Sequence, residues 1–205
     1  MKRRHLRRVV DIDVDKGGKF QKKWAMPPGR VLLTQKQIRA RVRQLGRAIS
    51  RRYRGRRVCF LGVMNGALFF LADLLRAVEL VDTEICCVRL ASYAGTRSTG
   101  RLRGLDTVGD SFHGRCVIIV DDILDTGRTL SALVRRVKKL GAAEVKICVL
   151  LEKRRKRECP FRADWIGFRV KDEFVVGYGL DYDGRYRGLK QVRVLKTTVT
   201  LRHKK

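Results

Sequence analysis

The chain has 205 residues, of which 44% are hydrophobic, so it is long and apolar enough for one domain with a buried core. No apolar stretch reaches the roughly 20 residues of a membrane-spanning helix, and the basic N-terminus lacks the apolar segment of a secretory signal. These features exclude a helical membrane protein, and we expect a cytoplasmic protein with no membrane partner.

The formal net charge of +28 would attract RNA, DNA or polyphosphates and would steer anionic substrates toward the protein. The basic residues are spread along the chain instead of forming one block. We therefore favour a solvated basic surface over dedicated nucleic-acid binding.

The six cysteines contain no Cys-x-x-Cys pair, and all but Cys159 lie in apolar, strand-like runs. This placement predicts buried thiols in a reducing compartment. The cysteines are Cys59, Cys86, Cys87, Cys116, Cys148 and Cys159.

Residues 1–29 are predicted to form a basic arm with an edge strand over 9–14, and residues 196–205 a basic tail. The segment between them, 30–195, is the predicted domain. Its first helix begins at Thr34-Gln35-Lys36-Gln37, which has the form of a capping box and precedes apolar residues at helical spacing.

Strand and helix signals then alternate, which is typical of an α/β fold with a parallel sheet. A tight turn is expected at Met64-Asn65-Gly66, a loop that closes over a site at 92–100, and a charged turn at 152–157. The predicted elements are a helix over 34–53, a strand over 57–63, a helix over 67–78, strands over 84–90 and 117–120, a helix over 129–140, and strands over 144–151, 163–170, 174–178 and 192–195.

The most informative stretch is the strand at 117–120 and the turn that follows it. Its four β-branched residues indicate a strand buried on both faces, as in the middle of a parallel sheet. Asp121 and Asp122 stand at its carboxyl end, where open α/β sheets bind ligands. The next turn is rich in small and hydroxyl residues and leads into a helix, whose free N–H groups suit a phosphate. The sequence therefore predicts a site for a sugar that carries a phosphate and vicinal hydroxyls.

The thirteen residues 117–129 closely resemble the signature of the type I phosphoribosyltransferases, which bind 5-phosphoribosyl-1-pyrophosphate. Further stretches occur in the order and approximate spacing of the hypoxanthine-guanine phosphoribosyltransferases, and the resemblance covers residues from about 30 to 195. These stretches are Gly62-Val63-Met64-Asn65-Gly66-Ala67, Ser92-Tyr93, Leu150-Leu151-Glu152-Lys153 and residues 172–182.

The resemblance implies an α/β fold of the type I phosphoribosyltransferase kind: a mostly parallel twisted sheet flanked by helices, with a small hood subdomain. The hood would be formed mainly by 155–195 together with the N-terminal segment. The implied activity is purine salvage, in which phosphoribosyl pyrophosphate and hypoxanthine or guanine give IMP or GMP and pyrophosphate with Mg²⁺ as cofactor. A homodimer or homotetramer is also implied.

For the sugar phosphate, the resemblance implies that Asp121 and Asp122 hold the ribose hydroxyls and help to position Mg²⁺. Many relatives have Glu in place of Asp121, a longer side chain with the same carboxylate. The residues implied to wrap the 5′-phosphate are Asp125, Thr126, Gly127, Arg128 and Thr129.

For the base, the resemblance implies that Asp125 faces the purine N7 as general base or acid, and that Lys153 donates to O6. Phe174 would stack on the ring, and the backbone of Val175 would read its edge. These contacts suit a 6-oxo purine and do not separate hypoxanthine, guanine and xanthine.

For pyrophosphate, the resemblance implies a second Mg²⁺ at Asp181 and contacts from Arg187, although Arg185 lies on the same loop. Many relatives have Lys in place of Asn65, and the family's cis peptide would fall between Met64 and Asn65. The remaining implied contacts are Met64, Asn65 and Gly66 on pyrophosphate, and Ser92 and Tyr93 closing over the reacting centre.

Two alternatives share the same fold. One is an RNA-binding regulator similar to the pyrimidine-operon attenuation protein, whose signature usually has an aromatic residue in place of Asp125. The other is a phosphoribosyltransferase specific for xanthine or adenine. Asp125, Lys153 and Phe174 favour purine chemistry.

Overall fold

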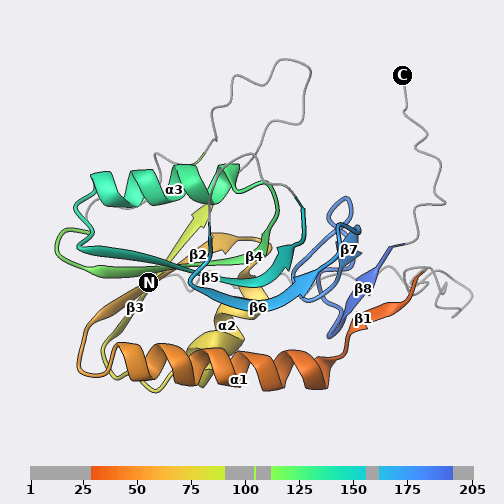
Figure 1. The fold of residues 1–205 in the computed structure, drawn as a ribbon, viewed down its shortest axis with the longest axis horizontal. Helices are drawn as coiled ribbons and strands as arrows, with labels where there is room; N and C mark the ends of the chain where they lie inside the picture. Colours follow the sequence, from red (N-terminus) through yellow and green to blue (C-terminus); the bar gives the residue numbers. More distant parts are fainter. Residues whose placement is uncertain (1–28, 91–103, 105–111, 156–161, 196–205) are drawn as a thin grey trace, which may run out of the picture.

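The structure is a computed structural model that describes residues 29–90, 104, 112–155 and 162–195, and these form two sheets and three helices (Figure 1). The predicted strand over 9–14 and the tail at 196–205 lie outside the described residues. In chain order the elements are β1 (Val31–Leu33), α1 (Gln35–Arg52), β2 (Val58–Met64), α2 (Leu68–Ala77), β3 (Thr83–Arg89), β4 (Cys116–Leu124), α3 (Arg128–Lys139), β5 (Glu144–Lys153), β6 (Trp165–Val170), β7 (Val175–Val176) and β8 (Val192–Val194).

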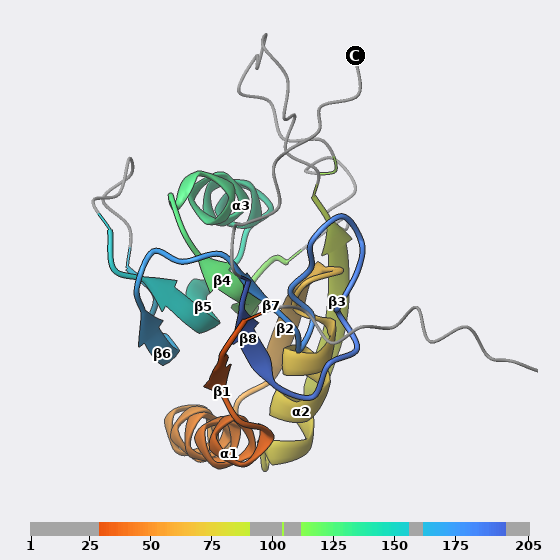
Figure 2. The same ribbon diagram turned by 90° about the vertical axis from the view of Figure 1, so that its right-hand side faces the viewer.

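The larger sheet has five parallel strands in the order β3-β2-β4-β5-β6. Helices α1 and α2 cover one face and α3 covers the other, as Figures 1 and 2 show. Side chains of β4 alternate between two apolar clusters: Ile118 and Val120 pack on the side of α1 and α2, and Val117 and Ile119 on the side of α3. The predicted central strand, buried on both faces, is confirmed.

Local signals account for where α1 begins. The Thr34 N–H donates to Oε1 of Gln37 at 2.9 Å, and the Gln37 N–H donates to Oγ1 of Thr34 at 3.3 Å, which confirms the capping box. Apolar side chains such as Ile38 and Ile49 are fully buried against the sheet. The sequence predicted this helix, α2 and α3 to within one or two residues.

The second sheet is antiparallel, with the order β1-β8-β7 (Figure 2). Strand β1 was not predicted, because three residues are too short for a periodic pattern and its partner, β8, lies far along the chain. Strand β7 has only two residues where a strand over 174–178 was expected, since Tyr178 has a positive φ of 52°. The division into arm, domain, hood and tail stays a prediction.

Two strands run further than the sequence suggested. β4 continues to Leu124, so Asp121 lies within the strand and pairs in register with Val149. β5 continues to Lys153, and Glu152, expected in a charged turn, is buried and accepts a hydrogen bond from Nε of Arg169 at 2.7 Å. Both strands extend beyond their apolar residues because they pair with each other as far as Leu124 and Glu152.

The cysteine prediction is correct for Cys59, Cys116 and Cys148, which are buried, but wrong for Cys87, which is exposed. Cys87 lies on β3, an edge strand of the sheet, whose alternate side chains point away from the core. The five described cysteines are free thiols, and Cys159 lies outside the described residues. None of the helices described is long and apolar enough to cross a membrane.

Candidate active site

A cavity of about 220 Å³ lies where β4 passes into α3. Gly127 is the N-cap of α3, with a positive φ of 82°, and has no side chain to cap the helix; the Arg128 N–H donates to the Thr126 hydroxyl at a long 3.4 Å. The helix therefore presents its first N–H groups and positive dipole end at the cavity, an arrangement that suits a phosphate. Of the predicted phosphate residues, Arg128 is exposed and does not line the cavity. The lining consists of Asp121, Asp122, Ile123, Leu124, Asp125, Thr126, Gly127, Thr129 and Leu130.

The acid pair forms the buried wall of this cavity. Oδ1 of Asp121 accepts a hydrogen bond from the backbone N–H of Asp122 at 2.9 Å. Burial, and then the neighbouring charge of Asp122, raise the pKa of Asp121 well above its usual value. Burial also raises the pKa of Asp122, against the opposing effects of its hydrogen bonds and of the positive charge of Arg187. The raised pKa values mean that ionising the two carboxyl groups is unfavourable. A positive charge or hydroxyl donors bound next to them would favour the ionised form.

The turn between β2 and α2 packs directly on the acid pair. A Cβ atom added at Gly66 would overlap Oδ2 of Asp122, so the backbone reaches this carboxylate only because residue 66 is glycine. A Cβ atom at Gly179, where φ is +103°, would overlap the carbonyl oxygen of Gly66. The peptide between Met64 and Asn65 is cis, as expected.

The loop that contains Gly179 also carries the predicted pyrophosphate residues. Nη2 of Arg187 lies 2.6 Å from Oδ1 of Asp181, and its Nη1 donates to the carbonyl of Gly179 at 2.7 Å. The other carboxylate oxygen of Asp181 accepts the Gly184 N–H at 2.8 Å. Arg187 is therefore held against this loop, whereas Arg185 is exposed.

A cluster of four charged side chains borders this cavity, and Asp125 belongs to both. Nζ of Lys153 is 3.3 Å from Oδ2 of Asp125 and 2.9 Å from Oδ1 of Asp172. Nη1 of Arg155 is 3.0 Å from Oδ1 of Asp125 and 3.5 Å from Oδ2 of Asp172. Hydrogen bonding from Lys153 lowers the pKa of Asp172. The side chain of Lys153 is only 13% exposed. Although Lys153 belongs to a run of basic residues, it is therefore not a solvated surface charge.

The sequence reasoning assigned Asp125 and Lys153 but missed Arg155 and Asp172. Asp172 begins one of the stretches that carry the resemblance, which was the available signal. Nothing in the sequence distinguished Arg155 from its basic neighbours.

Phe174 and Val175 lie at the edge of the second sheet. The ring of Phe174 is 45% exposed and packs edge-on against Tyr182, with ring centroids 5.6 Å apart. Val175 faces Val194 of β8, and the Leu195 N–H donates to the carbonyl of Phe174 at 2.9 Å. This pattern makes the pair of Val175 and Val194 a non-hydrogen-bonded one, so the N–H and C=O of Val175 point away from β8. Ser92 and Tyr93 lie outside the described residues.

Possible metal ligands occur here in pairs. Across the described ranges, no three His, Cys, Asp or Glu side chains gather to hold an ion. Mg²⁺ usually takes one or two protein carboxylates and completes its shell with water and substrate oxygens. The adjacent carboxylates of Asp121 and Asp122 fit that pattern, and Asp181 offers one further carboxylate that already pairs with Arg187.

The model of the phosphoribosyl transferase domain family matches residues 31–183. The chain is 40% identical over 171 residues to the bifunctional protein TilS/HprT of Listeria monocytogenes, covering 83% of this chain but 26% of that protein, so it spans about a quarter of that relative. It is 38% identical over 171 residues to the hypoxanthine-guanine phosphoribosyltransferase of Bacillus subtilis, covering 83% of this chain and 94% of the relative.

Solved structures agree with the sequence relatives. Hypoxanthine phosphoribosyltransferase from Trypanosoma cruzi, in complex with the product IMP, superimposes with a TM-score of 0.78 at 33% identity, covering 87% of this chain and 100% of that one. A hypoxanthine phosphoribosyltransferase from Staphylococcus aureus gives a TM-score of 0.77 at 33% identity, covering 82% of this chain and 91% of that one.

Proposed function

Because the chain belongs to the phosphoribosyl transferase domain family, among the hypoxanthine-guanine phosphoribosyltransferases, we propose that it is a purine-salvage enzyme. It would transfer the phosphoribosyl group of phosphoribosyl pyrophosphate to hypoxanthine or guanine, and release IMP or GMP and pyrophosphate. The observation that carries the proposal is the position of Asp125, which lines the cavity at α3 and pairs with Lys153. One carboxylate thus borders both the sugar-phosphate site and the base site.

The sugar phosphate is bound by the β4–α3 segment. Its 5′-phosphate lies at the N-terminus of α3, where Thr126, Gly127 and Thr129 surround it. Asp121 and Asp122 accept hydrogen bonds from the ribose hydroxyls, and these donors satisfy carboxylates that burial makes costly to ionise. Arg128 approaches the phosphate from the exposed side of the turn.

Pyrophosphate leaves between the β2–α2 turn and the loop that carries Arg187. Met64, Asn65 and Gly66 offer backbone groups on one side, and Arg187 offers a guanidinium on the other. Mg²⁺ held by the acid pair, and by Asp181, would supply neutralising charge for the leaving group.

The base lies on Phe174, with its 6-oxo edge toward Lys153. An ammonium group can donate to a purine oxygen but meets another donor at a 6-amino group, so this residue favours hypoxanthine and guanine over adenine. Asp125 takes the proton from N7 as the bond forms at N9. The backbone N–H and C=O of Val175, which point away from β8, read the remaining edge.

The direct test is to mix the protein with Mg²⁺, phosphoribosyl pyrophosphate and each of hypoxanthine, guanine, xanthine, adenine and uracil, and to follow nucleotide formation by chromatography. Asp125→Asn should lower kcat by about 10²–10⁴-fold if this carboxylate moves a proton. Asp172→Asn is the matched control, because it removes a carboxylate of the same cluster that has no part in the proposed reaction. Equal losses in the two variants would contradict the role of Asp125.

We also propose a cytoplasmic location, which the free thiols of the described cysteines support. Assembly into a homodimer or homotetramer stays a prediction, which sedimentation of the full chain would test.

A further inference from the structure

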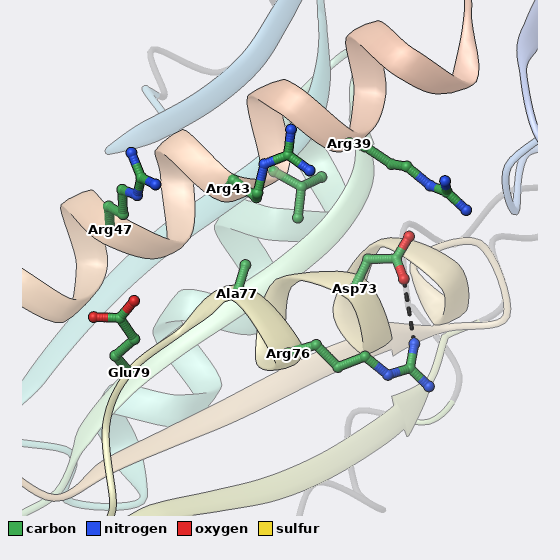
Figure 3. Close-up of a pocket in the computed structure, with 8 residues that line it drawn as sticks. Arg39, Arg43, Arg47, Asp73, Arg76, Ala77 and Glu79 are labelled. Carbon is green, nitrogen blue, oxygen red and sulfur yellow. Dashed lines mark hydrogen bonds and ion pairs between the residues drawn. The ribbon is translucent and has the colours of Figure 1, made fainter.

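A second cavity, of about 290 Å³, lies between α1 and α2 and shares no lining residue with the active-site cavity. Figure 3 shows Arg39, Arg43 and Arg47 in a row along α1, with Arg76 on the neighbouring helix α2. We call this feature the arginine groove. Its lining consists of Arg39, Val42, Arg43, Arg47, Asp73, Arg76, Ala77 and Glu79.

The close approach of the two helices builds the groove. A Cβ atom added at Gly46 would overlap the carbonyl oxygen of Ala77, so α2 can come this near to α1 only at a glycine. One turn later, the buried Ser50 hydroxyl donates to the Gly46 carbonyl and accepts the Glu79 N–H, both at 2.8 Å. These contacts hold the groove in shape without using any of its arginines.

The arginines on α1 divide into those that hold the described fold together and those that do not. Arg41 donates to the carbonyls of Gly167 and Ile166, and Arg52 pairs with Glu144. In contrast, Arg39, Arg43 and Arg47 are exposed and make no hydrogen bond or ion pair within the described residues.

The two carboxylates of the groove do not neutralise these cations. Asp73 is already engaged, because one oxygen accepts the Tyr178 hydroxyl at 2.7 Å and the other lies 3.2 Å from Nη1 of Arg76. Glu79 therefore is the one remaining acid in the lining, against three arginines on α1.

The cationic face continues beyond the cavity at both ends. Lys36 and Arg51 are exposed on the same side of α1 as the three arginines. At 100° and 1.5 Å per residue, positions 36 to 51 of this row lie within an arc of about 120° and extend along about 22 Å of the helix. A mononucleotide or pyrophosphate would occupy only part of this length, whereas a polymer could follow all of it.

We propose that the arginine groove binds the phosphate backbone of a nucleic-acid strand. Guanidinium groups bind phosphate oxygens in pairs, and successive arginines four residues apart meet successive phosphates. The lining has no aromatic side chain on which a base could stack, so binding reads the backbone and not the sequence. This binding is separate from catalysis, because no residue of the groove has a role in the proposed reaction.

The test compares two triple variants of the full chain that lose the same charge. The groove variant is Arg39→Gln, Arg43→Gln, Arg47→Gln, and the control is Arg135→Gln, Lys138→Gln, Lys139→Gln on the exposed side of α3, across the sheet. Binding of a fluorescent 20-nucleotide single strand of mixed sequence, as RNA and as DNA, is followed by anisotropy over a series of salt concentrations.

In the groove variant, the loss of three phosphate contacts should make the plot of log association constant against log salt concentration less steep by about 2. Binding at 0.1 M salt should weaken about 100-fold. The control should lose less than about tenfold. The same three arginines changed to lysine should keep the slope, since the charges stay, which also guards against a folding defect in the glutamine variant.

Equal losses in the groove and control variants would overturn the proposal, because they would show diffuse attraction to a basic surface. Failure of the wild-type chain to bind either strand at low salt would also overturn it. Unequal affinity for RNA and DNA, with the groove effect kept in both, would support it and identify the preferred strand.

Discussion

The contact between Gly66 and Asp122 allows a sharp test of how the active site is assembled. In Gly66→Ala the added methyl would overlap the carboxylate of Asp122, which lies on the central strand β4 and is half-buried. The carboxylate has little room to move, and Gly179 closes the other side of the turn. The overlap can therefore be removed only if the turn between β2 and α2 shifts. Overpacking of this kind lowers the free energy of unfolding by about 1–3 kcal/mol.

The effect on catalysis should be larger than the effect on stability. A displacement of about 1 Å at the acid pair lowers the rate about 100-fold, equal to about 2.7 kcal/mol of transition-state stabilisation. The assay is kcat/KM for phosphoribosyl pyrophosphate at saturating hypoxanthine, with urea unfolding of the same samples. Gly188→Ala is the matched control, because a Cβ atom at Gly188 meets nothing within 4 Å. Wild-type activity in Gly66→Ala, or an equal loss in the control, would refute the inferred contact between turn and carboxylate.

Three further changes have outcomes that differ in kind. Lys153→Met should lower kcat/KM for hypoxanthine by 10- to 100-fold or more while leaving any activity on adenine unchanged, measured with both bases; a parallel loss would argue against contact with O6. Ser50→Ala leaves the Glu79 N–H without its acceptor and should destabilise the fold by about 1–3 kcal/mol in urea, with unchanged kcat. Hydrogen bonding from Arg52 lowers the pKa of Glu144, so this stabilisation is present above the unfolded pKa and is lost as pH falls through the folded pKa. Arg52→Gln should therefore lower the urea midpoint at pH 7, and this difference from the wild type should disappear as the pH falls below the folded pKa of Glu144. A difference that persists in acid would contradict the ion-pair explanation.

Much of the α/β framework followed from local signals. The capping box at Thr34 and the apolar spacing through Ile49 predicted α1, because both depend on residues only three or four apart. The four β-branched residues before Asp121 predicted a doubly buried strand, because only the middle of a sheet accepts such a run. The order of acids, hydroxyls and glycine after that strand indicated a phosphate site for the same local reason.

Pairing between distant segments decided the rest. The extension of β4 through Asp121 depends on its ladder with β5, and β1 exists only because β8 lies beside it. The exposure of Cys87 follows from the edge position of β3 in the sheet order. None of these features has a signature within its own segment, since hydrogen-bond partners far along the chain create it.

The same division holds for the charged residues. The sequence by itself determined that the chain is strongly basic and that Asp125 belongs to a phosphate-binding turn. Only the tertiary structure placed Arg155 and Asp172 around Asp125 and Lys153. It also distinguished Arg41 and Arg52, which are paired, from Arg39, Arg43 and Arg47, which have no partner among the described residues. The physical reason is range: a charge acts on whatever folding brings within a few ångströms, and its neighbours in sequence do not specify that partner.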